Sequence, residues 1–72
     1  MTYETPNYTI IMQSANKAYF EHKRLGEDQA GGLWFDDSRT LIDYDGVYEV
    51  PKSVVAKLTE QGFNMDYATI TE

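Results

Sequence analysis

The 72-residue sequence predicts a single α+β domain: a small twisted antiparallel sheet of about four strands with one C-terminal helix packed on it. Two observations favour this class. Short segments rich in β-branched and aromatic residues, separated by turn-forming residues, fill the chain before Pro51. After Pro51, apolar residues recur at helical spacing. Because a chain of this length buries only about 60 % of its unfolded surface, we expect one small core.

Two strands are expected near the start of the chain. Asn7–Gln13 and Lys17–Leu25 are rich in β-branched and aromatic residues, and Ser14–Asn16 between them suits a short hairpin loop. Because side chains alternate along a strand, Phe20 is expected to point inward and its charged neighbours outward. Gly26–Gly32 then predicts a flexible loop, since its glycines and polar residues offer nothing to bury.

A second hairpin is expected in the middle of the chain. Leu33–Phe35 and Thr40–Tyr44 predict strands, joined by Asp36–Arg39, whose side chains can bond their own backbone in a turn. Asp45-Gly46 indicates a further turn, because glycine adopts positive φ at little cost, and it leads into the short segment Val47–Glu49.

The spacing of the apolar residues changes after Pro51, which suits the first position of a helix. One stripe of this helix is apolar and comprises Val54, Val55 and Leu58. Gly62 suits a left-handed C-terminal cap, with Phe63 placed to fold back on the helix. Tyr67–Thr71 fits either a last edge strand or a tail, and the sequence does not decide between them.

The chain is acidic, and its acid excess is local. Twelve acidic residues against six basic ones give a net charge of −6. Residues 27–49, here the acidic segment, hold seven acids and one base, so they carry the whole excess and the remainder is balanced. A negative field disfavours binding to nucleic-acid phosphates and to anionic membranes. We therefore expect a basic protein surface as the partner.

Metal, cofactor and membrane sites are not expected. The chain has no cysteine and one histidine, His22, so disulfides and zinc sites lack ligands. Asp43–Gly46 does not fit a calcium loop, because placing Gly46 at the sixth position puts Leu41 at the first and Lys52 at the twelfth. No segment approaches the roughly 20 apolar residues of a membrane span. The N-terminus also lacks the pattern of a secretion signal, which predicts a cytoplasmic protein.

Aromatic residues accompany the acids. Trp34, Tyr44 and Tyr48 lie in the acidic segment and fit a surface on which rings anchor a partner while carboxylates steer it. The same rings also fit the core, and the sequence leaves both interpretations open. Tyr19 and Phe20 fall on opposite faces of one strand and lack a basic track, which argues against a platform for stacking bases.

Three short motifs resemble a known family. Phe35–Ser38 (FDDS), Gly46-Val47 and Val50–Val55 (VPKSVV) follow one another in an order similar to that of small phage-encoded anti-CRISPR proteins of the type I-F class. The resemblance covers about a third of the chain. It implies a small acidic α+β protein without enzymatic activity that imitates nucleic acid electrostatically and blocks the DNA-binding surface of a CRISPR surveillance complex. It carries over Asp36 and Asp37 as candidate partner-contacting acids.

The sequence thus predicts a non-enzymatic, phage-encoded protein of the host bacterial cytoplasm that presents carboxylates to a basic, nucleic-acid-binding surface. Two alternatives are a generic bacterial or phage interaction or structural module, either monomer or homodimer, and a small hydrolase with paired aspartates. The expected partner-binding residues are acids and aromatic residues of the acidic segment: Asp36, Asp37, Asp43, Asp45, Glu49, Glu27, Asp28, Trp34, Tyr44 and Tyr48.

Overall fold

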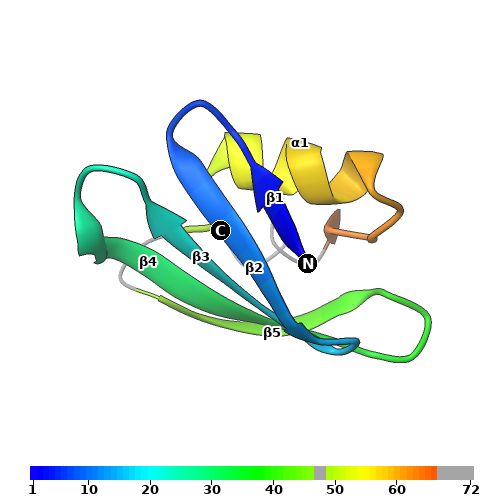
Figure 1. The fold of residues 1–72 in the computed structure, drawn as a ribbon. Coiled ribbons are helices and arrows are strands. Elements are labelled where there is room, and N and C mark those ends of the chain that lie inside the picture. Colours follow the sequence, from blue (N-terminus) through cyan, green and yellow to red (C-terminus); the bar gives the residue numbers. More distant parts are fainter. Residues whose placement is uncertain (47–48, 67–72) are drawn as a thin grey trace.

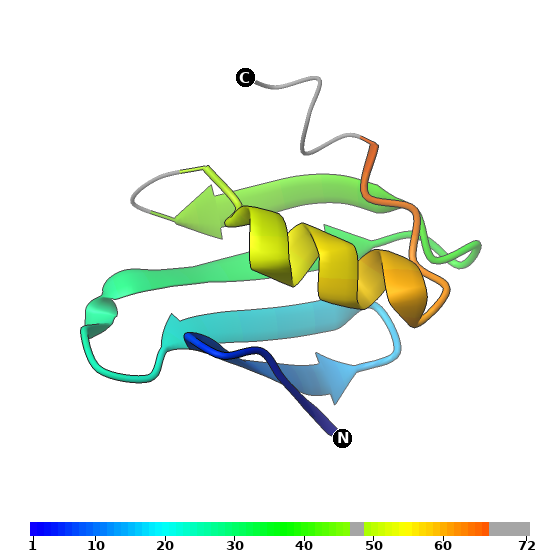
Figure 2. The same ribbon diagram turned by 90° about the horizontal axis from the view of Figure 1, so that it is seen from above.

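The computed structural model describes residues 1–46 and 49–66, which form one sheet and one helix. The sheet has five antiparallel strands that lie side by side in chain order. The strands are β1 (Thr2–Glu4), β2 (Tyr8–Ser14), β3 (Lys17–His22), β4 (Gly26–Phe35) and β5 (Leu41–Gly46), and helix α1 (Lys52–Glu60) follows them. The helix lies across one face of the sheet (Figure 2). The α+β class is therefore confirmed, with one strand more than the four or so expected.

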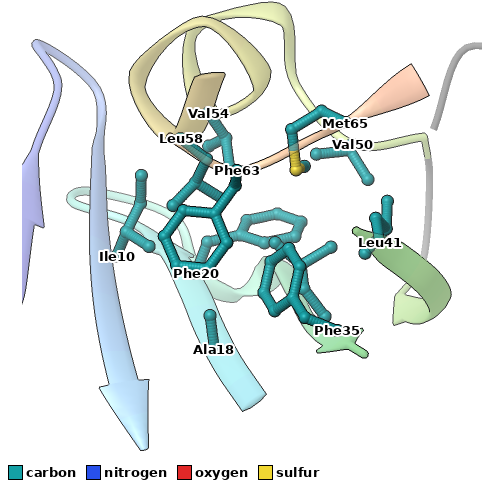
Figure 3. Close-up of a cluster of buried hydrophobic side chains, with 11 residues drawn as sticks. Ile10, Ala18, Phe20, Phe35, Leu41, Val50, Val54, Leu58, Phe63 and Met65 are labelled. Carbon is teal, nitrogen blue, oxygen red and sulfur yellow. The ribbon is translucent and has the colours of Figure 1, made fainter. Parts of the chain in front are cut away.

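The sheet has an inner face, toward α1, and an outer face on the other side. Each strand contributes to both faces, because its successive side chains point to opposite sides. One hydrophobic core fills the space between sheet and helix (Figure 3): Ile10, Ala18, Phe20, Leu33, Phe35, Leu41, Val50, Val54, Leu58, Phe63 and Met65. Val54 and Leu58 have no exposed surface, and Val55 packs partly against them, which confirms the predicted apolar stripe. Burying an aliphatic side chain of this size contributes about 1.5–3 kcal/mol.

The first predicted hairpin is confirmed, with a shorter second strand. β2 and β3 pair in antiparallel fashion, and the two residues after Ser14 form the turn. β3 ends at His22 rather than at Leu25. The Nδ1 atom of His22 accepts the backbone N–H groups of Arg24 and Leu25, each at 3.1 Å, so these residues turn instead of continuing the strand.

The prediction of a loop at Gly26–Gly32 is wrong, because this segment forms most of β4. β4 pairs with β3 at Gly26 and again from Ala30 onward. It pairs with β5 from Gly31 onward, so the backbone is bonded there although the side chains are small. Glycine at position 31 has a specific cause: a Cβ atom there would lie 2.8 Å from Cζ of Phe20 and 2.9 Å from the backbone oxygen of Asp45. That cause lies on the neighbouring strands, where a local pattern cannot reveal it.

The predicted turn at Asp45-Gly46 is also wrong. Both residues belong to β5, where Asp45 pairs with Gly32 and Gly46 with Gly31. Pairing with β4 keeps both residues in the strand, and glycine at position 31 lets the ring of Phe20 and the backbone of Asp45 approach β4 closely.

The fifth strand is β1, which pairs with β2 and brings Tyr3 beside Ile10. Its three residues are too few to show an alternating pattern in the sequence. Among the later expectations, Val47 and Tyr48 lie outside the described residues, as does Tyr67–Thr71. Glu49 is described and belongs to no strand.

The helix termini agree closely with the predicted signals. Pro51 is the N-cap, one position before the first helical residue. Gly62 has φ 93° and forms the left-handed C-terminal cap. The N–H of Gly62 donates to the oxygen of Thr59, and the N–H of Phe63 donates to the oxygen of Leu58, both at 3.0 Å. This pair of bonds is a Schellman motif, and it turns Phe63 back into the core as expected.

Candidate functional site

No described element covers the outer face of the sheet, because α1 packs on the inner face (Figure 1). Alternation and register place on it Thr2, Glu4, Thr9, Ile11, Gln13, Lys17, Tyr19, Glu21, Ala30, Gly32, Trp34, Asp43 and Asp45. Its centre is formed by β2, β3 and β4, and its edges by β1 and β5. This mixture of rings and charges on a rigid sheet is suited to recognition, because strands hold their side chains at fixed spacings.

An aromatic shelf, formed by Tyr19, Gly32 and Trp34, lies at the centre of this face. Tyr19 is paired with Gly32, and Trp34 is the next outer-face residue along β4. The indole ring of Trp34 leans over Gly32, so that a Cβ atom at position 32 would lie 3.1 Å from Cη2 of Trp34. Gly32 therefore leaves the space that the ring occupies, and both rings remain half-exposed.

The shelf borders an open groove of about 530 Å³. Lys17 lines the groove and holds its Nζ atom 5.1 Å from the centroid of the Trp34 ring, within the range of a cation–π interaction. Asp45 and Glu27 line it as well. The groove thus combines aromatic surface with two carboxylates and one ammonium group.

Four carboxylates give this surface a negative field. Glu21 and Glu27 lie beside Tyr19, and Asp43 and Asp45 lie along β5. Burial raises the pKa of Tyr19, and the charges of Glu21 and Glu27 raise it further. Neither of the two ion pairs found within residues 1–46 and 49–66 includes any of these acids, whereas Glu4, a further acid of this face, is paired with Lys23 at 2.9 Å. The four carboxylates outside these ion pairs therefore remain available to a cationic partner, although Lys17 and Lys23 lie nearby.

The structure brings together some of the predicted partner-binding residues and separates others. Trp34, Asp43 and Asp45 share the outer face, and Glu27 reaches the same groove. Tyr44 points the other way and packs against the hydrophobic core. These placements decide between the two interpretations of the aromatic residues: the tryptophan belongs to the surface and Tyr44 to the core, while Tyr48 lies outside the described residues.

Asp36 and Asp37 lie in the β4–β5 turn, at the opposite end of β4 from Glu27. Most of the length of β4 separates positions 27 and 36. The Oδ1 atom of Asp36 accepts bonds from the N–H of Ser38 at 2.9 Å, the hydroxyl of Ser38 at 2.7 Å and the N–H of Thr40 at 3.0 Å. The carboxylate of Asp36 therefore builds the turn.

The remaining predicted acids are also apart from the shelf. Asp28 is exposed just after the β3–β4 turn, and its N–H donates to the oxygen of Leu25. Glu49 lines a separate hollow beside Tyr8 and Pro51, near the start of α1. The acidic segment thus divides among the outer face, the β4–β5 turn and the start of the helix, instead of forming one continuous patch.

Asp36 and Asp37 do line a cavity of about 370 Å³, together with Arg39 and Phe63. A hydrolase with paired carboxylates needs one of them protonated at neutral pH. Hydrogen bonds from Ser38 and Thr40 instead lower the pKa of Asp36. This carboxyl group is suited to staying ionised and bonding its turn, which is the opposite of what a general acid requires.

Sequence reasoning missed three residues of this surface: Lys17, Tyr19 and Glu21. Alternation alone places them on one face of their strand. The neighbours of Tyr19 and Glu21 across the sheet lie on β4 within the segment predicted as a loop, so the register that joins Tyr19 to Gly32 could not be anticipated.

Comparison with known proteins finds no family model, no curated protein and no solved structure that matches this chain. Within the described ranges, no three or more histidine, aspartate or glutamate side chains gather in a way that could hold a metal ion. The helix in those ranges is too short and too polar to cross a membrane.

Proposed function

We propose that this protein is a non-enzymatic binding protein whose outer sheet face docks on a basic, nucleic-acid-binding surface of a partner protein. The observation that carries the proposal is the uncovered aromatic shelf with four carboxylates around it and one lysine. Rings supply contact area at low cost in conformational entropy, and carboxylates speed the encounter with a basic surface and compete there with phosphates.

The size of the molecule supports docking through a face. The Cα atoms extend over 32 × 27 × 18 Å, so the short dimension is the thickness of the sheet and helix layers. The broad faces are comparable with the ~800 Å² that each partner contributes to a standard interface. One such contact occupies nearly the whole outer face, which suits a protein that blocks a surface rather than one that encloses a substrate.

The resemblance to type I-F anti-CRISPR proteins makes a CRISPR surveillance complex of the host cytoplasm the first partner to test. In this proposal the protein occupies the basic groove through which that complex binds DNA, and so inhibits it. The outer-face acids Asp43 and Asp45 contribute the contacts. Asp36, which the resemblance suggests, is committed to hydrogen bonds within its own turn and supports the fold.

The test compares two double variants with the same change of net charge. Asp43→Lys with Asp45→Lys reverses two acids of the outer face, and Glu49→Lys with Glu60→Lys reverses two exposed acids near the two ends of the helix. Binding to purified type I-F surveillance complex is measured with and without double-stranded DNA as competitor, at low and high salt. We expect the outer-face variant to bind at least about tenfold more weakly, and the matched variant to change by less than about threefold.

Three results bear against the proposal. Equal weakening of both variants would show that net charge, and not the outer face, determines binding. Unchanged binding by both would remove the acids from the interface. No binding by the unaltered protein would rule out this partner and leave the generic interaction module.

The generic alternative, a homodimer, is favoured by one observation: Ile42 on the edge strand β5 is 52 % exposed. Antiparallel pairing of two β5 strands would bring Asp43 and Asp45 of both copies together, however, and like charges facing each other are unfavourable. Measuring the molar mass by light scattering at low and high salt separates the two proposals. A dimer that is no weaker at low salt would favour the homodimer proposal.

A further inference from the structure

We infer that the outer face recognises an arginine side chain of its partner, whose guanidinium stacks on Trp34 and donates hydrogen bonds to Asp45. This inference rests on the proposed function and names the chemical group that the surface reads.

The shelf already holds a cation. The ammonium group of Lys17 lies 5.1 Å from the centroid of the Trp34 ring. Lys17 takes part in neither of the ion pairs found within the described residues, and its ammonium group is in electrostatic contact with the Trp34 ring. Tryptophan is the aromatic side chain that binds cations best. Lys17 therefore occupies the position that an incoming cation would take, and its flexible side chain can withdraw into solvent.

A guanidinium suits this position better than a second ammonium. It is planar, stacks on aromatic rings, is weakly hydrated and presents several N–H donors in one plane. Asp45 is paired with Gly32, the residue over which the indole leans, so a carboxylate lies across the shelf from the ring. A guanidinium stacked on Trp34 can thus donate hydrogen bonds, in its own plane, to the oxygen atoms of Asp45. An ammonium group at this position would interact only as a point charge.

The groove accommodates the length of an arginine side chain. It is lined by Tyr19, Gly32 and Trp34 as well as by Glu27 and Asp45, so an aliphatic stem can lie on aromatic surface while the head meets carboxylates. Four acids against Lys17 attract the cation and exclude an anionic residue from the same place. Charge complementarity therefore identifies the occupant as a basic side chain. The stacking of a planar guanidinium on the Trp34 ring identifies that side chain as arginine.

Trp34 is the only tryptophan of the chain, so its fluorescence reports on the shelf alone. The experiment titrates the protein with an oligo-arginine peptide and an oligo-lysine peptide of equal length and charge, at one salt concentration. We expect the arginine peptide to bind about tenfold more tightly, which corresponds to about 1.4 kcal/mol, and to change Trp34 emission. Lys17→Met should strengthen arginine binding two- to fivefold, and Lys52→Met, which removes an exposed lysine on the helix, should strengthen it less.

The outcomes separate the inference from the proposed function. Absence of binding by both peptides would contradict the basic-partner proposal itself. Equal affinities, or binding without a change in Trp34 emission, would overturn the arginine inference and leave that proposal standing. Trp34→Leu should abolish the preference for arginine. If this variant does not fold, as judged by circular dichroism, Asp45→Asn makes the same test, and a retained preference there would refute the role given to that carboxylate.

Discussion

Gly31 is the position at which one added methyl group tests the packing of the sheet. It lies on the inner face of β4, between Phe20 of β3 and Gly46 of β5. In the Gly31→Ala variant the new Cβ atom would lie 2.8 and 2.9 Å from two atoms of the Phe20 ring and 2.9 Å from the backbone oxygen of Asp45. The ring is packed in the core and the oxygen belongs to a paired strand, so neither can move without cost.

The expected loss follows from these contacts. Overpacking a core by one methyl group costs typically about 1–3 kcal/mol. Alanine restricts the unfolded chain and returns about 0.4–1 kcal/mol of this. The middle of each range gives a net loss of about 1.3 kcal/mol, a substantial part of the roughly 4–11 kcal/mol expected for a domain of this length. It corresponds to a decrease in Tm of roughly 5–10 °C.

Gly32→Ala is the matched control, because the neighbouring glycine faces outward. Its Cβ atom would meet only the half-exposed ring of Trp34, which can swing aside. We expect the stability of this variant to stay within about 0.5 kcal/mol of the parent. Urea unfolding followed by far-ultraviolet circular dichroism measures both variants. A Gly31→Ala protein as stable as the parent, or less stable than it by no more than the control, would refute the close approach of Phe20 to the β4 backbone.

Three further predictions concern the turn and the core. Arg39 has φ 66° and stacks on Phe63, with its guanidinium carbon 4.0 Å from the ring centroid; Arg39→Gly should be more stable than Arg39→Ala by about 1 kcal/mol in thermal unfolding, because only glycine relieves the left-handed strain. Hydrogen bonds lower the folded-state pKa of Asp36, so its contribution to stability is present at neutral pH and is lost as the pH falls below the usual aspartate range. Asp36→Asn should therefore be less stable at pH 7 and lose less stability on acidification, and parallel curves of unfolding free energy against pH would contradict this. Leu58→Ala should lose about 2–5 kcal/mol because Leu58 is fully buried, while Thr59→Ala at the exposed neighbouring position should lose less than about 0.5 kcal/mol.

The elements predicted correctly are those whose cause lies within a few residues. The helix from Lys52 to Glu60 has its apolar stripe, its proline before the first turn and Gly62 after the last one, and each signal acts through local backbone geometry. The β2–β3 hairpin is similar, since alternation and a short polar connection are properties of adjacent residues.

β4 shows why the rest could not be predicted. Its first half carries glycine and polar residues, which by themselves favour a loop, yet this half joins β3 at Gly26 and Ala30. Gly31, which follows, is paired on both sides and lies beneath the ring of Phe20. Strand pairing satisfies the backbone irrespective of side chain, and the partners are distant in sequence. For the same reason the outer face could not be predicted, because Tyr19 and Trp34 become neighbours only when β3 and β4 are placed in register.

By itself, the sequence determined the α+β class, the helix and its caps, the first hairpin, and the restriction of the acid excess to residues 27–49, because these follow from composition and near-neighbour spacing. Only the tertiary structure decided where that charge lies. It places Tyr44 against the core, and it gathers Asp43, Asp45 and Trp34 on one face with residues of β3. The physical reason is that a strand directs alternate side chains to opposite faces, while strand register, set by long-range pairing, chooses the neighbours that each one meets.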